Sequence, residues 1–464
     1  MLPDPALIGP GTSHHLQHPL SVVLRPAWVV SVAEPGEAEG TSGAQIVCRA
    51  GVGPPVWLEH AGWRVLARPD EQSEAQGDVV AAFTVEAGRT VRAIREAGGN
   101  VVVPFSLSEA YRAYVAETWR LAAPRGRGLS ERQLALFYRV KTLIPRRVQL
   151  FARRSLIRYQ GVPAFPAWPL DTSVSRLVRF FAACALRAAG REEGEFAWFW
   201  PGRHRAALAL THDVESTEGI RLALALADLE EEHGFRSAFN FGGWYDVDPG
   251  VLRELSGRGF EIGMHGLVHD RTLFSSREAF EASLPGLGSL AQRLGAVGFR
   301  SPATHRVFDW LAELPVEYDC TIPNSDPYEP QPGGCCSVWP FFVGPVVELP
   351  YTLPQDHTLL TLLGRRSPNE WLEQAARIEA EYGLVQCVTH PDRGYLAEPE
   401  KRSVYAAFLQ GLAERDGLWR ALPREIAAWW RHRAGGGGRD GESRHGTVSL
   451  REGAAFADFE PPAP

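Results

Sequence analysis

Two kinds of hydrophobic pattern divide the chain. Between residues 28 and 105, short apolar runs such as WVVSVA and NVVVPF alternate with breaks that contain Gly, Pro or Asp, which predicts a small strand-rich or α/β domain. From about His204 to Arg431, apolar strand-like runs alternate with helical patterns. A repeated strand-then-helix order is typical of parallel strands in an α/β barrel. We therefore predict an α/β fold in which a smaller domain precedes a (β/α) barrel.

The same patterns predict five segments along the chain. A flexible arm covers residues 1–26, and the small domain covers residues 27–106. Helical patterning over residues 107–200 predicts a helical connector, and the barrel-type domain covers residues 201–432. Residues 433–464 begin with a glycine-rich run and end in EPPAP, so we predict a disordered tail.

Composition restricts the classes of partner and location. A formal net charge of -7 over 464 residues gives no electrostatic reason to expect binding to nucleic acid or to an anionic membrane. No stretch has the ~18 consecutive apolar residues of a membrane span, and the amino terminus lacks the pattern of a secretory signal. The basic run RRVQLFARR could form an amphipathic helix at a membrane surface, but the favoured interpretation is the charged, solvated face of a packed helix. Six cysteines without a CxxC pair favour a reducing compartment, so we expect a cytoplasmic protein.

Polar residues suited to hydrolysis follow several predicted strands, which is where barrel enzymes place their active sites. The apolar strand in ALALTHDVE leads to Asp213 and Glu215, whose carboxylates leave an extended backbone on the same side. Two such carboxylates repel each other unless a cation lies between them or one of them is protonated. A metal ligand beside a general base would use this arrangement, and a solvated acid pair in a loop is the alternative.

The strand in FEIGMHGLVHD leads to His265 and His269, spaced so that one helical turn would place both imidazoles on one side. Neutral imidazole is a good ligand for Zn²⁺, and two histidines with one carboxylate leave coordination positions for water and substrate. The alternative is a pair of capping or core histidines. We predict one divalent metal ion, and Zn²⁺ is the favoured ion.

Two further strand ends carry Arg300 and His390. The guanidinium of Arg300 in VGFRSPATHR could hold a carboxylate in a fixed orientation, or could pair with an acid at the surface. His390 in LVQCVTHPDRGY could donate a proton to an amine leaving group, with Asp392 as its orienting partner, or could be structural. Asp356 or His357 in the preceding segment could reach the site, and a plain loop is the favoured interpretation of that segment.

The order of these four motifs resembles that of the polysaccharide deacetylase family, the NodB-homology domains of carbohydrate esterase family four. The resemblance covers about half of the chain. It implies a distorted (β/α) barrel and the metal-dependent removal of an N-acetyl group from a carbohydrate. It also implies Asp213 as the catalytic base, Arg300 as the residue that positions it, His390 as the acid, and His265 and His269 as metal ligands.

The chain departs from the common pattern of this family in three places. Members usually have adjacent Asp residues in the first motif, whereas Val214 occupies the second position here. The variant form Asp-x-Glu implies Glu215 as the third metal ligand. The third motif has Ala303 and Thr304 where members usually have an aromatic residue and Gly. No segment matches the fourth motif of the family convincingly.

Two other functions are compatible with the sequence. An amidase on the same scaffold would act on a non-sugar C–N bond, such as that of a cyclic imide or ureide, and would open a ring instead of releasing acetate. A non-catalytic carbohydrate-binding protein would stack sugar rings on aromatic side chains, and its candidates are Trp244, Tyr245, Trp310 and Trp339. A binding protein needs no proton-transfer residues, so the joint presence of base, ligands and acid favours an enzyme. The expected partner is a carbohydrate or another N-acylated compound.

Overall fold

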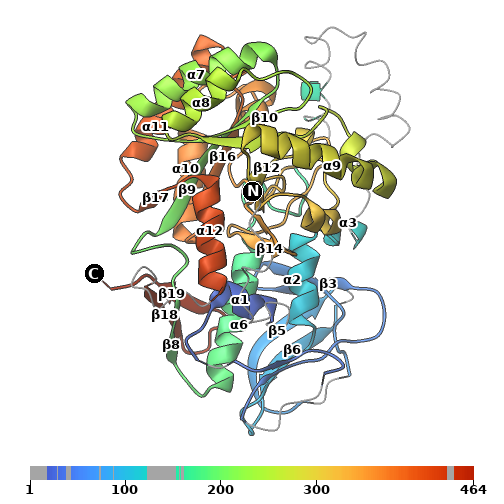
Figure 1. Cartoon of the computed structure of the whole chain (residues 1–464). Coiled ribbons are helices and arrows are strands. Elements are labelled where there is room, and N and C mark those ends of the chain that lie inside the picture. Colours follow the sequence, from blue (N-terminus) through green and yellow to red (C-terminus); the bar gives the residue numbers. More distant parts are fainter. Residues whose placement is uncertain are drawn as a thin grey trace. The chain divides into compact units, whose positions relative to one another are not determined.

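The computed structural model describes residues 18–28, 30–37, 43–72, 75–86, 88–122, 153–155, 157, 161–435 and 444–463. The chain forms two compact units, each built from segments that are far apart in the sequence (Figure 1). Unit 1 consists of Met1–Ala113, Ser175–Arg203 and Trp429–Pro464, and unit 2 consists of Tyr114–Val174 and His204–Ala428.

Unit 1 contains a seven-stranded mixed sheet and a three-stranded antiparallel sheet. The larger sheet has the order β1-β2-β7-β6-β5-β3-β4, with β1 (Val32–Ala33), β2 (Ile46–Cys48), β3 (Val56–His60), β4 (Trp63–Ala67), β5 (Asp78–Val85), β6 (Thr90–Arg95) and β7 (Val101–Val103). The smaller sheet has the order β19-β18-β8, with β8 (Glu193–Ala197), β18 (His445–Leu450) and β19 (Ala457–Glu460). The helices that begin or end in this unit are α1 (Pro19–Leu24), α2 (Leu107–Val115), α6 (Ser173–Ala188) and α12 (Pro423–Ala434).

These elements correct three of the predicted segments. The predicted arm includes α1, whose first turn is capped by His18, because its Nδ1 accepts a hydrogen bond from the N–H of Leu20 (3.3 Å). The predicted helical connector contributes β8, and the predicted disordered tail contributes β18 and β19. The tail prediction is wrong because these short strands are stabilised by pairing with β8, a distant segment that composition does not reveal. Residues 123–152 of the connector, with most of the basic run RRVQLFARR, lie outside the described residues.

Unit 1 also contains a buried arginine that binds main-chain carbonyls instead of an acid. The guanidinium of Arg433 donates hydrogen bonds to the carbonyl oxygens of Ala197 (2.8 Å), Trp198 (3.0 Å) and Leu24 (3.3 Å). No carboxylate among the described residues pairs with it, and burial lowers the pKa of Arg433 to about 9. The side chain therefore joins α12 to two other segments of the unit.

Replacing Arg433 with Met is expected to lower the free energy of unfolding by about 3–5 kcal/mol, because buried carbonyls lose their donors at ~1–3 kcal/mol each. Urea denaturation at neutral pH measures this difference. Arg431→Met, which changes a half-buried arginine two residues away on the same helix, is the matched control. Equal stabilities of the Arg433→Met variant and the wild type would show that the carbonyls find other donors.

Unit 2 is built around a nine-stranded sheet with the order β14-β15-β13-β12-β11-β10-β9-β16, and β17 also pairs with β9. Its strands are β9 (Ala206–Val214), β10 (Ala238–Phe241), β11 (Glu261–Met264), β12 (Gly298–Phe299), β13 (Tyr318–Asp319), β14 (Phe341–Val343), β15 (Val346–Glu348), β16 (Leu384–Thr389) and β17 (Leu418–Arg420). Its α-helices are α3 (Trp119–Ala122), α7 (Thr217–Glu232), α8 (Pro249–Gly257), α9 (Arg277–Leu294), α10 (Asn369–Ala380) and α11 (Pro399–Ala413). Shorter helices are the 3₁₀ turns η4 (Thr272–Phe274), η5 (Pro302–Thr304) and η6 (Phe308–Glu313) and the π-helix η7 (His357–Leu362).

The sheet of unit 2 is mainly parallel and curled. Its strands pair in parallel except β14 with β15, and the late strand β16 returns to pair with β9, the first strand of the sheet. The N–H groups of Thr352 and Leu353, after β15, donate to the carbonyl oxygen of Gln386 in β16 (3.2 and 3.1 Å). Helices α7, α8, α10 and α11 pack in contact with one another or with these strands (Figure 1). The predicted α/β class with parallel strands is confirmed.

The local sequence explains the first strand and helix of this sheet. All nine residues of β9 are buried, as expected for an apolar central strand that is covered on both faces. Ser216 follows the strand and caps α7, because its hydroxyl oxygen accepts a hydrogen bond from the N–H of Gly219 (3.1 Å). Asp213 is therefore held in a buried strand, and Glu215 is held between that strand and a capped helix. None of the helices in the described part of the chain combines the length and apolar composition that a membrane span requires.

Candidate active site

Asp213 lies at the carboxyl end of β9 and is almost fully buried, with 4% of its surface exposed. Its Oδ1 accepts hydrogen bonds from Nδ2 of Asn240 (2.8 Å) and from Nη1 of Arg300 (3.2 Å). Asn240 stands opposite Asp213 in the neighbouring strand β10 and was not among the predicted site residues. The signal for it was available in the sequence, since SAFNF places a polar residue near the end of an apolar strand.

Arg300 connects Asp213 to the end of β13 and to a second residue of β9. Its Nε donates to the carbonyl oxygen of Cys320 (2.9 Å), and its Nη1 also donates to Oγ1 of Thr211 (2.8 Å). Burial raises the pKa of Asp213, but the positive charge of Arg300, with smaller contributions from His265, His390 and Asn240, outweighs burial and holds this pKa below its usual range. The carboxylate is therefore ionised at neutral pH.

His265 follows β11 and presents one ring nitrogen for a ligand. Its Nδ1 lies 3.0 Å from the carbonyl oxygen of Arg300, and a carbonyl oxygen only accepts, so Nδ1 carries the proton and donates. The lone pair of Nε2 is then available to a metal ion. Burial lowers the pKa of His265 to about 4, so the imidazole is neutral at neutral pH, as a metal ligand must be.

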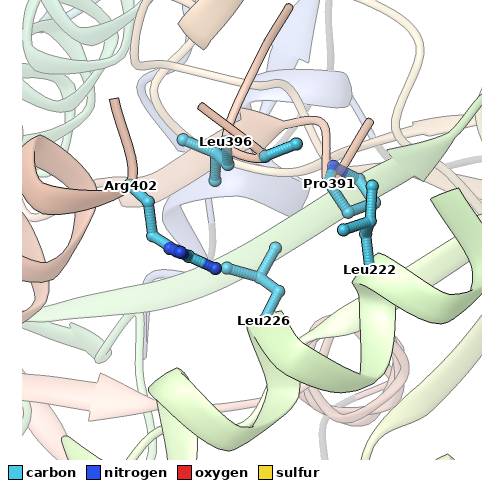
Figure 2. A pocket seen from close by; sticks show the side chains of 6 residues that line it. Leu222, Leu226, Pro391, Leu396 and Arg402 are labelled. Atoms are coloured by element: carbon cyan, nitrogen blue, oxygen red, sulfur yellow. The ribbon is translucent and has the colours of Figure 1, made fainter. Parts of the chain in front are cut away.

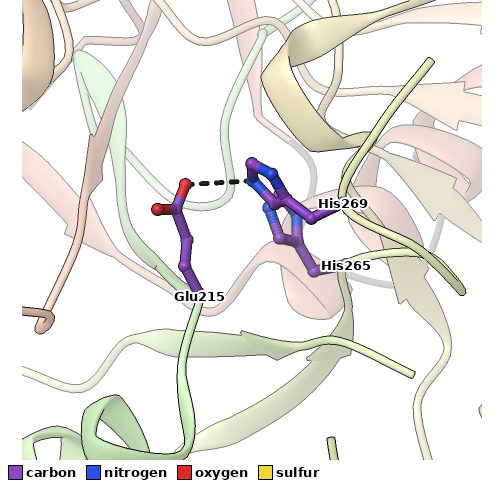
Figure 3. A group of neighbouring side chains, drawn as sticks. All are labelled: Glu215, His265 and His269. Atoms are coloured by element: carbon purple, nitrogen blue, oxygen red, sulfur yellow. Dashed lines mark hydrogen bonds and ion pairs between the residues drawn. The ribbon is translucent and has the colours of Figure 1, made fainter. Parts of the chain in front are cut away.

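Glu215, His265 and His269 form the candidate metal centre (Figure 3). One ligand atom from each residue lies within 4.8 Å of the others, and Nε2 of His269 is 3.1 Å from Oε1 of Glu215. Nitrogen and oxygen ligands lie ~2.0–2.2 Å from Zn²⁺, so two ligands of one ion stand roughly 3–3.5 Å apart. The donor set, the free Nε2 of His265 and the 3.1 Å separation of His269 from Glu215 fit one divalent ion.

A turn, and not the predicted helical turn, brings the two histidines together. Residues 265–271 contain no helix, and Gly266 has φ +93, a left-handed conformation that favours glycine. A Cβ atom at Gly266 would also lie 3.1 Å from Cδ of Pro302. The close approach of the segment after β12 therefore requires glycine between the histidines.

His390 follows β16 and is oriented by Asp356. Nδ1 of His390 donates to Oδ1 of Asp356 (2.7 Å), and the N–H of His390 donates to Oδ2 of the same carboxylate (3.0 Å). Nε2 of His390 lies 3.7 Å from Oε1 of Glu215, so the ring faces the candidate metal centre. The prediction of a plain loop around Asp356 is therefore wrong. Asp356 directly precedes the π-helix η7, an irregular element that often marks functional sites.

Asp392, which we expected to orient His390, has another role. Its carboxylate accepts hydrogen bonds from the N–H of Glu215 (3.0 Å) and from the hydroxyl of Ser216. It therefore holds the turn between β9 and α7, and this turn carries one of the candidate metal ligands. The orienting residue could not be chosen by spacing, because Asp356 lies 34 residues before His390.

Replacing Asp356 with Asn is expected to lower the pKa of His390. Burial lowers this pKa, but the charge and hydrogen bond of Asp356 outweigh burial and raise it to about 10. A folded pKa above the unfolded value of ~6.5 stabilises the protein fully below pH ~6.5, and this stabilisation is lost as the pH rises through about 10. NMR titration of the metal-free protein measures the pKa, and denaturation at several pH values measures the stability difference. An unchanged pKa in Asp356→Asn would contradict the assignment.

The four aromatic candidates occupy different places. Trp244 lies at the metal centre, because its ring is 5.2 Å from that of His269 and its Nε1 donates to the carbonyl oxygen of Glu215 (3.2 Å). The hydroxyl of Tyr245 donates to the carbonyl oxygen of Val214. Trp310 packs on Phe274 and Phe280, and Trp339 is fully buried. Trp244 is therefore the one of the four whose ring contacts a candidate ligand.

The third motif keeps a backbone that favours glycine although it contains none. Ala303 has φ 49 and Thr304 has φ 52, both in the left-handed region. Thr304 is β-branched and buried, and its hydroxyl has no hydrogen-bond partner among the described residues. A strained, buried residue of this kind persists only where its surroundings hold it, which is common beside functional sites.

A small cavity lies next to the segment that carries His390 (Figure 2). Its volume is about 10 Å³, which is room for roughly one water molecule. It is lined by Leu222, Leu226, Pro391, Leu396, Ala397 and Arg402. This space is too small for a sugar ring.

Comparisons with known proteins give structural likeness only. No family model and no curated protein sequence matches this chain. A putative polysaccharide deacetylase from Mycobacterium smegmatis is 20% identical over 50% of this chain and 92% of its own, with a TM-score of 0.41. Puue allantoinase is 16% identical over the same shares, with a TM-score of 0.40. A family 4 carbohydrate esterase from Streptomyces lividans is 12% identical over 46% of this chain and 91% of its own, with a TM-score of 0.31.

Proposed function

We propose that unit 2 is a metal-dependent hydrolase that removes an N-acetyl group from a carbohydrate. The observation that carries the proposal is the arrangement of ionisable groups at one edge of the sheet. An ionised Asp213, held by Arg300, stands beside the Glu215–His265–His269 cluster, and a protonated His390 faces the same cluster. These are the parts that hydrolysis of an amide needs: a base, a Lewis-acid site and an acid.

Glu215, His265 and His269 would hold the metal ion in this proposal. A bound divalent ion polarises a carbonyl group and lowers the pKa of a water molecule toward ~7. The carbonyl oxygen of Arg300 fixes the ring of His265 and leaves its Nε2 available to hold the ion.

Asp213 would act as the base through its Oδ2 atom. Oδ1 already accepts two hydrogen bonds, from Asn240 and Arg300, whereas Oδ2 lies 3.9 Å from Nδ1 of His265 and accepts none from the described residues. The proton of the attacking water therefore goes to Oδ2. Arg300 keeps the carboxylate charged until that step.

His390 would act as the acid through Nε2. Asp356 accepts a hydrogen bond from Nδ1 of His390 and favours the protonated imidazole. The Nε2–H group therefore remains available to donate its proton to the amine nitrogen as that nitrogen leaves the acetyl carbon. The stacked ring of Tyr395, 4.5 Å away, limits the rotation of His390. The fold that we assign to unit 2 is a distorted (β/α) barrel, in which these strand ends form the site.

Metal analysis and acetate release test this function. We expect about one Zn²⁺ or similar ion per purified chain, and acetate release from N-acetylated glycans by the loaded protein. Ring opening of a cyclic imide or ureide without acetate release would support the amidase instead. No metal in the wild type, even after reconstitution, would contradict the proposal.

A further inference from the structure

A loop at the candidate active-site edge carries a carboxylate that the proposed reaction does not use. The loop follows β13 and leads to β14, whose first residue Phe341 pairs with Glu348 at the carboxyl end of β15. Both ends of the loop therefore lie at the carboxyl edge of the parallel strands, together with Arg300 and His390. Glu329 is near the middle of this loop.

The loop around Glu329 is held rigidly on both sides. Asp326 and Gly333 exchange two main-chain hydrogen bonds (2.7 and 3.0 Å), which close the segment between them. The carboxylate of Asp326 also accepts from the N–H of Tyr328 (2.8 Å). On the other side, Gln331 and Arg306 exchange two hydrogen bonds (3.1 and 2.9 Å). The neighbours of Glu329 are thus fixed before any ligand binds, as a specific binding site requires.

The side chain of Glu329 is different, because it is buried without a partner. Only 8% of the residue is exposed, and its carboxylate makes no hydrogen bond or ion pair with the described residues. Neither carboxylate oxygen of Glu329 is sealed from solvent, so both oxygens face a space that water reaches. Buried polar groups are nearly always hydrogen-bonded, so an unpaired carboxylate in a rigid loop indicates a group that binds a ligand.

The charges around Glu329 indicate which ligand group fits. Burial and the nearby Asp326 raise the pKa of Glu329 to about 7, and the positive charges of Arg153, His390 and Arg306 act in the opposite direction. Because the charge of His390 lowers the pKa of Glu329, the two side chains are close enough to interact electrostatically, and His390 is the proposed acid. A cationic ligand would be repelled by the two arginines, whereas a neutral hydroxyl donates to a carboxylate without that penalty.

We propose that Glu329 is a substrate-binding residue that accepts hydrogen bonds from hydroxyl groups of the carbohydrate whose acetyl group lies at the Glu215–His265–His269 cluster. The inference rests on the proposed function and names the part of the substrate that this carboxylate recognises. A carboxylate has two acceptor oxygens, so neighbouring hydroxyls of one sugar ring can both be bound. Glu329 does not contribute to the binding affinity of an N-acetylated compound that has no hydroxyl groups.

Calorimetric titration of metal-free protein with the tetrasaccharide of N-acetylglucosamine tests the inference without turnover. Glu329→Gln keeps the size of the side chain and replaces one acceptor oxygen with a donor. We expect its Kd to rise about 10- to 100-fold, the range for a lost hydrogen bond to a charged group. Glu373→Gln, on an exposed position of α10, is the matched control and should bind as the wild type does. The Tm of Glu329→Gln should not fall, because no contact within the protein is lost and a carboxylate whose pKa is raised by burial costs stability when it is ionised.

The zinc-loaded enzyme supplies the second comparison. In Glu329→Gln we expect kcat/KM to fall for the tetrasaccharide, through KM, and to stay unchanged for 4-nitroacetanilide, an N-acetyl compound without hydroxyls. Equal effects on the two substrates, unchanged binding of the tetrasaccharide, or no binding by the wild type would overturn the inference. A different result would separate the two proposals. If Glu329→Gln weakens binding of the tetrasaccharide but the wild type releases no acetate, the proposed function fails. The recognition of hydroxyl groups by Glu329 is then still supported.

Discussion

Asp213→Asn is expected to lower kcat for acetate release by about 10²- to 10⁴-fold, the usual range for loss of a general base, while the metal content stays at the wild-type level. Asn has the same size, and its amide oxygen can still accept from Arg300 and Asn240 at the Oδ1 position. Its amide nitrogen then replaces Oδ2, the atom that would take the proton. The metal ligands are other residues, so the ion stays bound.

The measurement is steady-state kinetics together with elemental analysis of the same samples. Removing one charge of a buried ion pair can also destabilise the fold by ~3–5 kcal/mol, so the Tm must be measured as well. Asp416→Asn changes an exposed carboxylate of the same unit to the same amide and should leave the rate, metal content and Tm unchanged. A near-normal rate in Asp213→Asn with metal retained would show that Asp213 is not the base.

His265→Ala is expected to lose both the metal and the activity. This residue offers a neutral Nε2 that is oriented by the carbonyl oxygen of Arg300, and the two ligands that remain, Glu215 and His269, already form a hydrogen bond with each other. Even loss of a group that only orients a ligand lowers metal affinity ~10- to 100-fold, so loss of the ligand itself should lower it by at least about 100-fold. Metal per chain after dialysis against a weak chelator measures the effect.

The control for this variant is His233→Ala, which removes a half-buried imidazole at the end of α7 in the same unit. It should retain the ion and the rate. If His265→Ala kept about one ion per chain, the metal centre would lie elsewhere. Glu215 and His269 would then not be metal ligands either. Loss of metal with a wild-type rate would instead favour a metal-free reaction.

Much of the candidate site follows from the sequence because strand ends are local. An apolar run followed by a polar residue indicates where a parallel strand reaches the edge of its sheet, and this holds for Asp213, Arg300 and His390. Parallel strands then bring these ends together whatever the lengths of the connections between them. The cap of α7 by Ser216 is also local, since it depends on residues three positions apart.

Other parts depend on contacts that no spacing encodes. Asp356 lies in a segment without periodicity, and it meets His390 only because the chain after β15 runs along β16. The geometry at His265 and His269 comes from a left-handed glycine and the approach of Pro302, and not from a helical turn. In the sequence EPQPGG, Glu329 has the pattern of an ordinary acidic residue in a loop. Only its burial without a partner makes it a candidate for binding the substrate.

By itself the sequence determined strands β9, β10, β11, β12 and β16 and the edge at which the polar residues gather, because hydrophobic periodicity, caps and strand ends act over a few residues. The tertiary structure decided which distant groups pair: Asp356 with His390, β18 with β8, and the guanidinium of Arg433 with carbonyl oxygens. The physical reason is that a buried charge or a short strand is stabilised by partners far away in the chain. The free energy of such pairs depends on burial and distance, which exist only once the chain has folded.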